Sequence, residues 1–133
     1  MSVDENKAIV QRHIEAFNTQ NVDAFDELAT PEMAQQSKDI TRVGYATFEG
    51  HHITVTDMIA EGDTVVVRVT TRGGHSGEFE GIPATGKQWT NTGVLFYRLT
   101  DGKIVELDTL FDQLGHIKQL GATITPPASN QAN

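Results

Sequence analysis

The sequence predicts an α+β domain in which N-terminal helices pack on a curved antiparallel sheet. Before residue 30, apolar residues recur at the spacing of amphipathic helices. After residue 52 they alternate with a period of two, which indicates half-buried strands. Short turn sequences at residues 61–63 and 100–103 join the alternating segments as hairpins would. Helices followed by a run of strands favour two packed layers, with the helices on one face of the sheet.

The first helix begins after Ser2 or Asp4, either of which can cap it. It ends within residues 18–21, and a shorter helix follows over residues 22–29. The buried face of the first helix carries Ile9, Val10, His13, Ile14 and Phe17. Residues 33–48 give only a weak helical pattern, which Gly44 weakens further, and we leave this stretch open.

Four strands are expected after this stretch, over residues 53–59, 64–72, 88–99 and 104–111. The second is expected to turn one face inward, and this face carries Val65, Val67, Val69 and Thr71. Its wetter face carries Val66, Arg68, Thr70 and Arg72. A last short helix over residues 113–120 follows Asp112, which is placed to cap it.

Composition indicates one ordinary globular domain over residues 1–121 and a flexible tail over residues 122–133. The 133 residues include no cysteine, so disulfides and thiolate chemistry are excluded. No basic leader or long apolar run is present, and we expect a cytoplasmic protein. A net charge of −8 argues against nucleic acid and anionic membranes as partners.

The common cofactor and metal motifs are absent from the sequence. It contains no P-loop, no dinucleotide-binding fingerprint and no zinc-protease motif. His51 and His52 are neighbours on a strand, so they face opposite sides and do not chelate one ion. We therefore expect no cofactor and no metal.

A sheet that curls around the first helix leaves a cavity, which is the default ligand site. His13 shares the buried helix face with Phe17 and is the first candidate, although a hydrogen-bonded core histidine is the simpler alternative. His75 faces the cavity if strand alternation survives Gly73 and Gly74. On the third strand, one face carries Trp89, Asn91, Gly93, Leu95 and Tyr97, where the small Gly93 would leave room in the cavity.

Three segments of the C-terminal third resemble the SnoaL-like polyketide cyclases of the nuclear transport factor 2-like (cystatin-like) superfamily. They are GEFEGIPATGK, FYRLTDGKIVE and FDQLGHIKQLG. The resemblance implies a cone-shaped α+β barrel and a pocket-lining Phe17. It also implies a strand and a loop between the second and third helices, but this interval is short, so either the strand or the third helix is missing. Relatives of this kind dimerise through the outer face of the sheet, and we expect a homodimer through Arg68, Thr70, Arg72, Thr90, Thr92 and Phe96.

The resemblance also bears on the catalytic residues. In the antibiotic cyclases an aspartate on the last strand is the general acid/base of an aldol closure, and here Thr109 falls at that position. Polar contacts of the preceding strand fall on Gly93 and Leu95. Asp112 is the best remaining carboxylate if a bulge turns it inward, and a helix cap if not.

Two classes of function follow. The first is a cofactor-independent cyclase or isomerase that removes a proton next to a carbonyl, with His13 or Asp112 as the base and His75 or Tyr97 as hydrogen-bond donor. The second is a catalytically silent module that binds a small hydrophobic molecule or dimerises. Besides His13, we expect the cavity to be lined by Phe17, Trp89, Asn91, Leu95, Tyr97, Leu107 and Thr109. Burial in this cavity should hold the pKa of His13 below its usual value.

Overall fold

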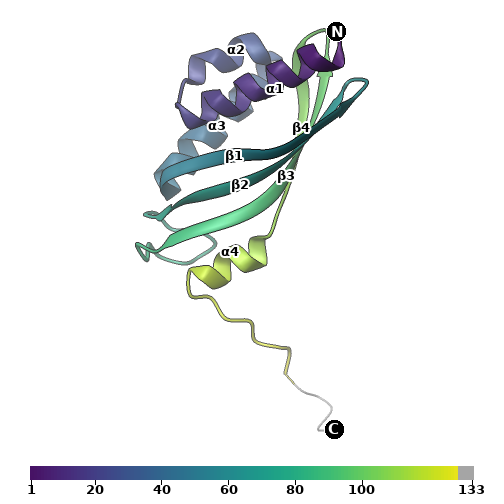
Figure 1. The fold of residues 1–133 in the computed structure, drawn as a ribbon. Helices are drawn as coiled ribbons and strands as arrows, with labels where there is room; N and C mark the ends of the chain where they lie inside the picture. Colours follow the sequence, from purple (N-terminus) through teal and green to yellow (C-terminus); the bar gives the residue numbers. More distant parts are fainter. Residues whose placement is uncertain (129–133) are drawn as a thin grey trace.

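The computed structural model describes residues 1–128, and helices and strands fill most of its length (Figure 1). Three N-terminal helices cover one face of a four-stranded antiparallel sheet, and a short C-terminal helix lies at one end of that sheet (Figure 1). The expected α+β class is therefore confirmed. Residues 122–128 form no helix or strand, and the rest of the expected tail lies outside the described residues. No helix in the described part of the chain is long and apolar enough to cross a membrane.

Helix α1, Val3–Asn18, begins at the expected cap. The Ser2 hydroxyl accepts a hydrogen bond from the Glu5 backbone N–H at 3.1 Å, and the Glu5 carboxylate accepts one from the Ser2 N–H at 3.2 Å. This reciprocal pair is a capping box. The buried face holds Val10, His13, Ile14 and Phe17, as the spacing predicts.

Residues 33–48, whose helical pattern in the sequence is weak, are helical up to Thr47. A short 3₁₀ turn, η1 at Val22–Ala24, leads into α2, Phe25–Leu28. Helix α3, Pro31–Thr47, begins at a proline, which suits a first helical position. Before it, Ala29 forms only a single parallel bridge with Ile104, where the Thr30 N–H donates to the Ile104 carbonyl at 3.1 Å. The shortened interval therefore removes the strand and keeps the helix.

The sheet order is β1-β2-β3-β4, with β1 at Phe48–Glu61, β2 at Thr64–His75, β3 at Gln88–Thr100 and β4 at Lys103–Phe111. All neighbouring strands are antiparallel. Pairing of β1 with β2 is irregular at two places, and such irregularities bend a strand. The concave face carries the apolar side chains that pack on α1, including Val65, Val67 and Val69, all fully buried.

Helix α4, Gln113–Gln119, is hydrogen-bonded to β3 through the side chain of Gln119. The Gln119 amide accepts from the Thr90 N–H at 3.0 Å and donates to the Thr90 carbonyl at 2.7 Å. A second, smaller apolar cluster forms here from Phe48, Trp89 and Leu120. This docking brings His116 of α4 over the sheet, next to Trp89.

Candidate functional site

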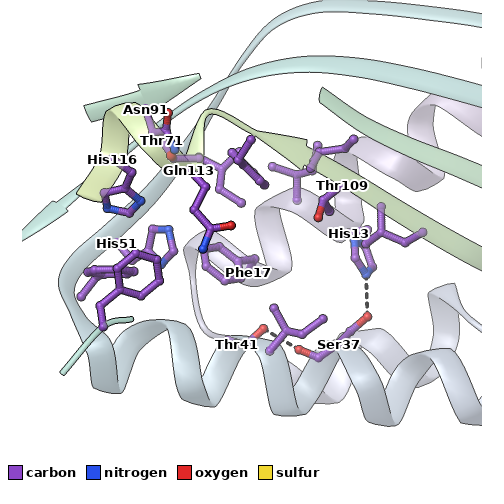
Figure 2. A pocket seen from close by; sticks show the side chains of 18 of the residues that line it. His13, Phe17, Ser37, Thr41, His51, Thr71, Asn91, Thr109, Gln113 and His116 are labelled. Atoms are coloured by element: carbon purple, nitrogen blue, oxygen red, sulfur yellow. Dashed lines mark hydrogen bonds between the residues drawn. The ribbon is translucent and has the colours of Figure 1, made fainter. Parts of the chain in front are cut away.

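A cavity of about 360 Å³ lies between α1, α3 and the concave face of the sheet (Figure 2). Its wall is largely apolar, and its size is in the range of small-molecule sites. Polar side chains gather at two separated places. One group contains His13, Ser37 and Thr109, and the other contains His51, Thr71, Asn91 and His116 (Figure 2). We call these the His13 end and the His51 end.

At the His13 end, one imidazole is hydrogen-bonded on both nitrogens. The Tyr97 hydroxyl lies 3.1 Å from Nδ1, and the Ser37 hydroxyl lies 2.9 Å from Nε2. A neutral imidazole has one N–H, so one of these hydroxyls donates to the ring and the other accepts from it. Phe25 and Tyr97 also pack against the ring, with centroids 5.0 and 5.4 Å away. The position and tilt of His13 are therefore fixed.

Burial determines the charge of this group. His13 is only 6% exposed, and desolvation lowers its pKa to about 4, which confirms the expected direction. Desolvation likewise raises the pKa of Tyr97 far above its usual range. At neutral pH both side chains are uncharged. The His13 end therefore offers an imidazole and two hydroxyls that can exchange protons inside an apolar wall.

The His51 end is built from aromatic rings. Trp89 packs on His116 with ring centroids 4.0 Å apart, and His51 lies 5.5 Å from Trp89. Phe48 contacts all three rings at centroid distances of 4.6 to 5.5 Å. Nδ1 of His51, Nε1 of Trp89 and Nε2 of His116 are buried without a hydrogen-bond partner among the described residues.

Burial also lowers the pKa of His51, to about 4, an effect that the Gly44 carbonyl opposes and His116 reinforces. The pKa of His116 is lowered by burial and by its neighbour His75. Gly44 of α3 lies directly beside the His51 ring, because a Cβ at this position would be 3.1 Å from Nδ1 of His51. Both imidazoles are therefore neutral near pH 7.

The structure places some of the expected site residues in the cavity wall and others outside it. His13 and all seven expected wall residues line the cavity: Phe17, Trp89, Asn91, Leu95, Tyr97, Leu107 and Thr109. Whether they bind a substrate stays a prediction. Gly93 leaves no room there, because the Phe111 ring fills the space above it, so that expectation was wrong.

His75 and Asp112 do not converge with His13. His75 is fully buried, and its Nδ1 lies 2.8 Å from the Thr85 hydroxyl and accepts the Thr85 backbone N–H at 3.2 Å. Asp112 is exposed and accepts the Gly115 N–H at 2.9 Å, which is the cap of α4. Neither residue is part of the cavity wall.

Several polar wall residues were not foreseen from the sequence, among them Ser37, His51 and His116. Ser37 lies on α3, whose pattern was too weak to assign a face. His51 and His52 face opposite sides of the strand, so one of the pair faces the cavity, and the structure shows that this is His51. His116 reaches the site through the docking of α4, which local sequence does not reveal.

The fold and the cavity define a small α+β cone protein with a helix-covered apolar pocket. The sequence model of the SnoaL-like polyketide cyclase family matches residues 7–120, and the chain belongs to this family.

Two curated relatives are similar to this chain over most of its length. Aklanonic acid methyl ester cyclase DnrD of Streptomyces peucetius is 30% identical over 109 residues, which cover 82% of this chain and 74% of the relative. Aklanonic acid methyl ester cyclase DauD of Streptomyces sp. (strain C5) is 27% identical over 128 residues, covering 85% and 80%. Among solved structures, TsrD of Streptomyces laurentii superimposes with a TM-score of 0.85 at 24% identity, covering 92% of this chain and 99% of TsrD. This last likeness concerns the fold alone.

Proposed function

We propose that this protein is a cofactor-independent cyclase or isomerase that performs acid/base chemistry next to a carbonyl in its apolar cavity. The observation that carries the proposal is the neutral imidazole of His13, held in the cavity wall by two hydroxyls. Membership of the SnoaL-like polyketide cyclase family and the cyclase names of the two curated relatives support this class of reaction.

The proposed reaction is an intramolecular aldol addition. His13 accepts a proton from a carbon that lies next to a carbonyl group, which leaves an enolate. The enolate carbon then attacks a second carbonyl carbon of the same molecule, forming one C–C bond and an alkoxide. The proton returns from the imidazolium to the alkoxide oxygen, so the product is an isomer of the substrate. No oxidant, reductant or co-reactant is consumed.

A weakly basic imidazole suits an acidic C–H. Because burial disfavours the imidazolium, His13 is a poor base toward an ordinary ketone. A carbon between two carbonyls loses a proton far more readily, and its enolate can be stabilised by a hydroxyl donor. Tyr97 is neutral and fully buried, and in the tautomer whose Nδ1–H donates to it, its own O–H is free to donate to the developing oxyanion. The proposed substrate class is therefore a small, ring-containing polyketide with neighbouring carbonyls.

The test uses aklanonic acid methyl ester, the compound named in the two curated relatives. Product is followed by chromatography as a new species of unchanged mass. We expect turnover by the wild type and a loss of about 10²–10⁴-fold in His13→Gln, the range for removal of a general base. Thr109→Val is the matched control, because it lines the same end without the imidazole. Turnover retained in His13→Gln would reject His13 as the base.

A catalytically silent ligand-binding module is the second candidate. One observation favours it: of the described residues that line the cavity, Glu80 alone carries a carboxylate, and this side chain is exposed. The position that resembles the catalytic aspartate of antibiotic cyclases holds Thr109. Binding of the ester without any turnover, in the wild type as in His13→Gln, would favour this second function.

We also propose a homodimer through the outer face of the sheet, and a cytoplasmic location. Arg68, Arg72, Thr90, Thr92 and Phe96 are exposed on this face, and Phe96 is 47% exposed. Two-fold dimers with an isologous interface are the commonest oligomers. Light scattering at tens of micromolar should give twice the mass of one chain, and a monomeric mass would reject the dimer.

A further inference from the structure

The His51 end contains an unusual concentration of buried polar atoms without partners. Five such side-chain atoms occur among the described residues, and three of them belong to His51, Trp89 and His116. All three residues line the cavity and pack against one another. An unsatisfied buried donor or acceptor costs about 1–3 kcal/mol, so a ligand atom that pairs with one of these groups would recover part of that cost.

Local rotation does not relieve these atoms. Phe48 packs on all three rings, Phe17 packs edge-on to His51 at 5.0 Å, and Phe79 packs on His116 at 4.8 Å. The rings are therefore held on several sides by other rings. Figure 2 shows His51 and His116 on the same side of the cavity, well away from His13 and Ser37.

The chemistry of these three residues selects the group. An indole N–H only donates, and a neutral imidazole donates from one nitrogen and accepts at the other. No lysine or arginine lines the described cavity, and Glu80 contributes a negative charge to the wall. An anionic group would therefore lose its hydration without gaining a cation. An uncharged oxygen that accepts hydrogen bonds meets no such penalty.

We propose that His51, Trp89 and His116 form a second binding subsite, which takes an uncharged carbonyl oxygen of a ketone or ester and rejects a free carboxylate. The inference rests on the proposed function only in that the cavity binds a small carbonyl compound. The lowered pKa values of His51 and His116, caused mainly by burial, agree with it because both rings stay neutral near pH 7.

The two ends of the cavity then have different tasks. Both nitrogens of His13 already have partners within the protein, so a further hydrogen bond there requires one of them to be released. Nε1 of Trp89 and Nε2 of His116 have no partner among the described residues, and Nδ1 of His51 faces only the Gly44 backbone. These atoms have almost no accessible surface, so a ligand reaches them by displacing one of the rings. This subsite therefore holds the ligand by one carbonyl and places the rest of it along the apolar wall toward His13.

The test compares an ester with its acid. The probes are methyl anthraquinone-2-carboxylate and anthraquinone-2-carboxylate, which share a flat ring system and differ in charge. Trp89 is the only tryptophan of the chain, so quenching of its fluorescence reports binding at the subsite itself. We expect the wild type to bind the ester at least about tenfold more tightly than the acid at neutral pH.

Variants then test which side chains cause the preference for the ester over the acid. His116→Phe keeps an aromatic ring and should reduce the ester affinity about tenfold, which brings it close to that of the acid. His52→Phe is the matched control, because His52 is the next residue of β1 and does not line the cavity. Trp89→Phe, followed by calorimetry, provides a second removal if His116→Phe fails to fold, as judged by circular dichroism.

Three outcomes would overturn the subsite: equal wild-type affinity for ester and acid, no binding of the ester, or a full ester preference in the folded His116→Phe or Trp89→Phe variants. These results are independent of catalysis. His13→Gln should lose turnover and keep the ester preference, so a failure of the proposed function and a failure of the subsite give different results.

Discussion

The two ends of the cavity contain histidines with similar pKa values and opposite hydrogen-bonding states. Burial lowers the pKa of both His13 and His51 to about 4. His13 is bonded through both nitrogens, to Tyr97 and Ser37. His51 has a buried nitrogen without a partner in the described chain. Both histidines are therefore neutral at pH 7, and they differ in hydrogen bonding. The protein satisfies both nitrogens of His13, whereas one nitrogen of His51 is left for the proposed ligand.

This difference suggests a division of work between catalysis and recognition. A base must keep a fixed place and a proton partner, which the hydroxyls on either side of His13 provide. A recognition site must present unused donors and acceptors, which the His51 end provides. Each prediction below changes one end and leaves the other intact.

The largest expected effect is on the pH dependence of stability. Unfolded, both imidazoles take up a proton near pH 6.5, whereas folded they do so only near pH 4. Between these values the unfolded state binds more protons, so stability falls as the pH falls. Each histidine contributes up to about 1.4 kcal/mol per pH unit. Urea unfolding of the wild type across this window should lose stability more steeply than His51→Phe, by the contribution of one histidine.

Carboxylates also titrate in this window, but they are shared by the two proteins and cancel in the difference. Parallel pH curves for the wild type and His51→Phe would show that His51 titrates alike in the folded and unfolded states. In that case the cavity does not keep this imidazole neutral, and the proposed rejection of anions would lose its basis.

A smaller effect is expected from removing one hydroxyl at the His13 end. Tyr97→Phe deletes the partner of Nδ1 and leaves that nitrogen buried and unsatisfied, which should cost about 1–3 kcal/mol of unfolding free energy. Thr109→Val removes the hydroxyl of an exposed side chain from the same end and should change stability much less. Chemical denaturation measures both. Equal costs for the two variants would contradict a specific role for the Tyr97 bond.

The smallest effect is expected at Gly44. A Cβ there would lie 3.1 Å from His51 Nδ1 and 3.5 Å from the Phe17 ring, so the His51 ring must shift by a few tenths of an ångström. Alanine is favoured over glycine inside a helix by about 1 kcal/mol. Gly44→Ala should therefore leave stability unchanged or slightly raised while weakening binding of the ester probe a few-fold. Unchanged affinity would mean that the exact place of His51 has no influence on the ligand.

Sequence patterns predict the architecture and one wall of the cavity well. The helical spacing of Val10, His13 and Phe17 fixes which face of α1 is inward, and the alternation along β3 fixes Trp89 and Tyr97. These positions follow from local periodicity alone. The His13 end was therefore within reach of the sequence, except for Ser37 on the weakly patterned α3.

The His51 end could not be predicted from the sequence, because it depends on how separate elements pack against one another. His116 meets Trp89 only after α4 docks through Gln119 on Thr90. His51 lies against Gly44 because α3 ends at Thr47 and leads directly into β1. The bulge that would have turned Asp112 inward does not form, and this carboxylate remains the cap of α4.

The most direct test of the account is an NMR titration of the histidine side chains, with two-bond proton–nitrogen spectra to identify the protonated nitrogen of each ring. We predict that His13 and His51 remain neutral as the pH falls through 6.5 and take up a proton only near pH 4. The nitrogen shifts of His13 should also show hydrogen bonds at both positions. A His13 that titrates near pH 6.5, as an exposed imidazole does, would contradict both its burial in the cavity and its proposed role as the base.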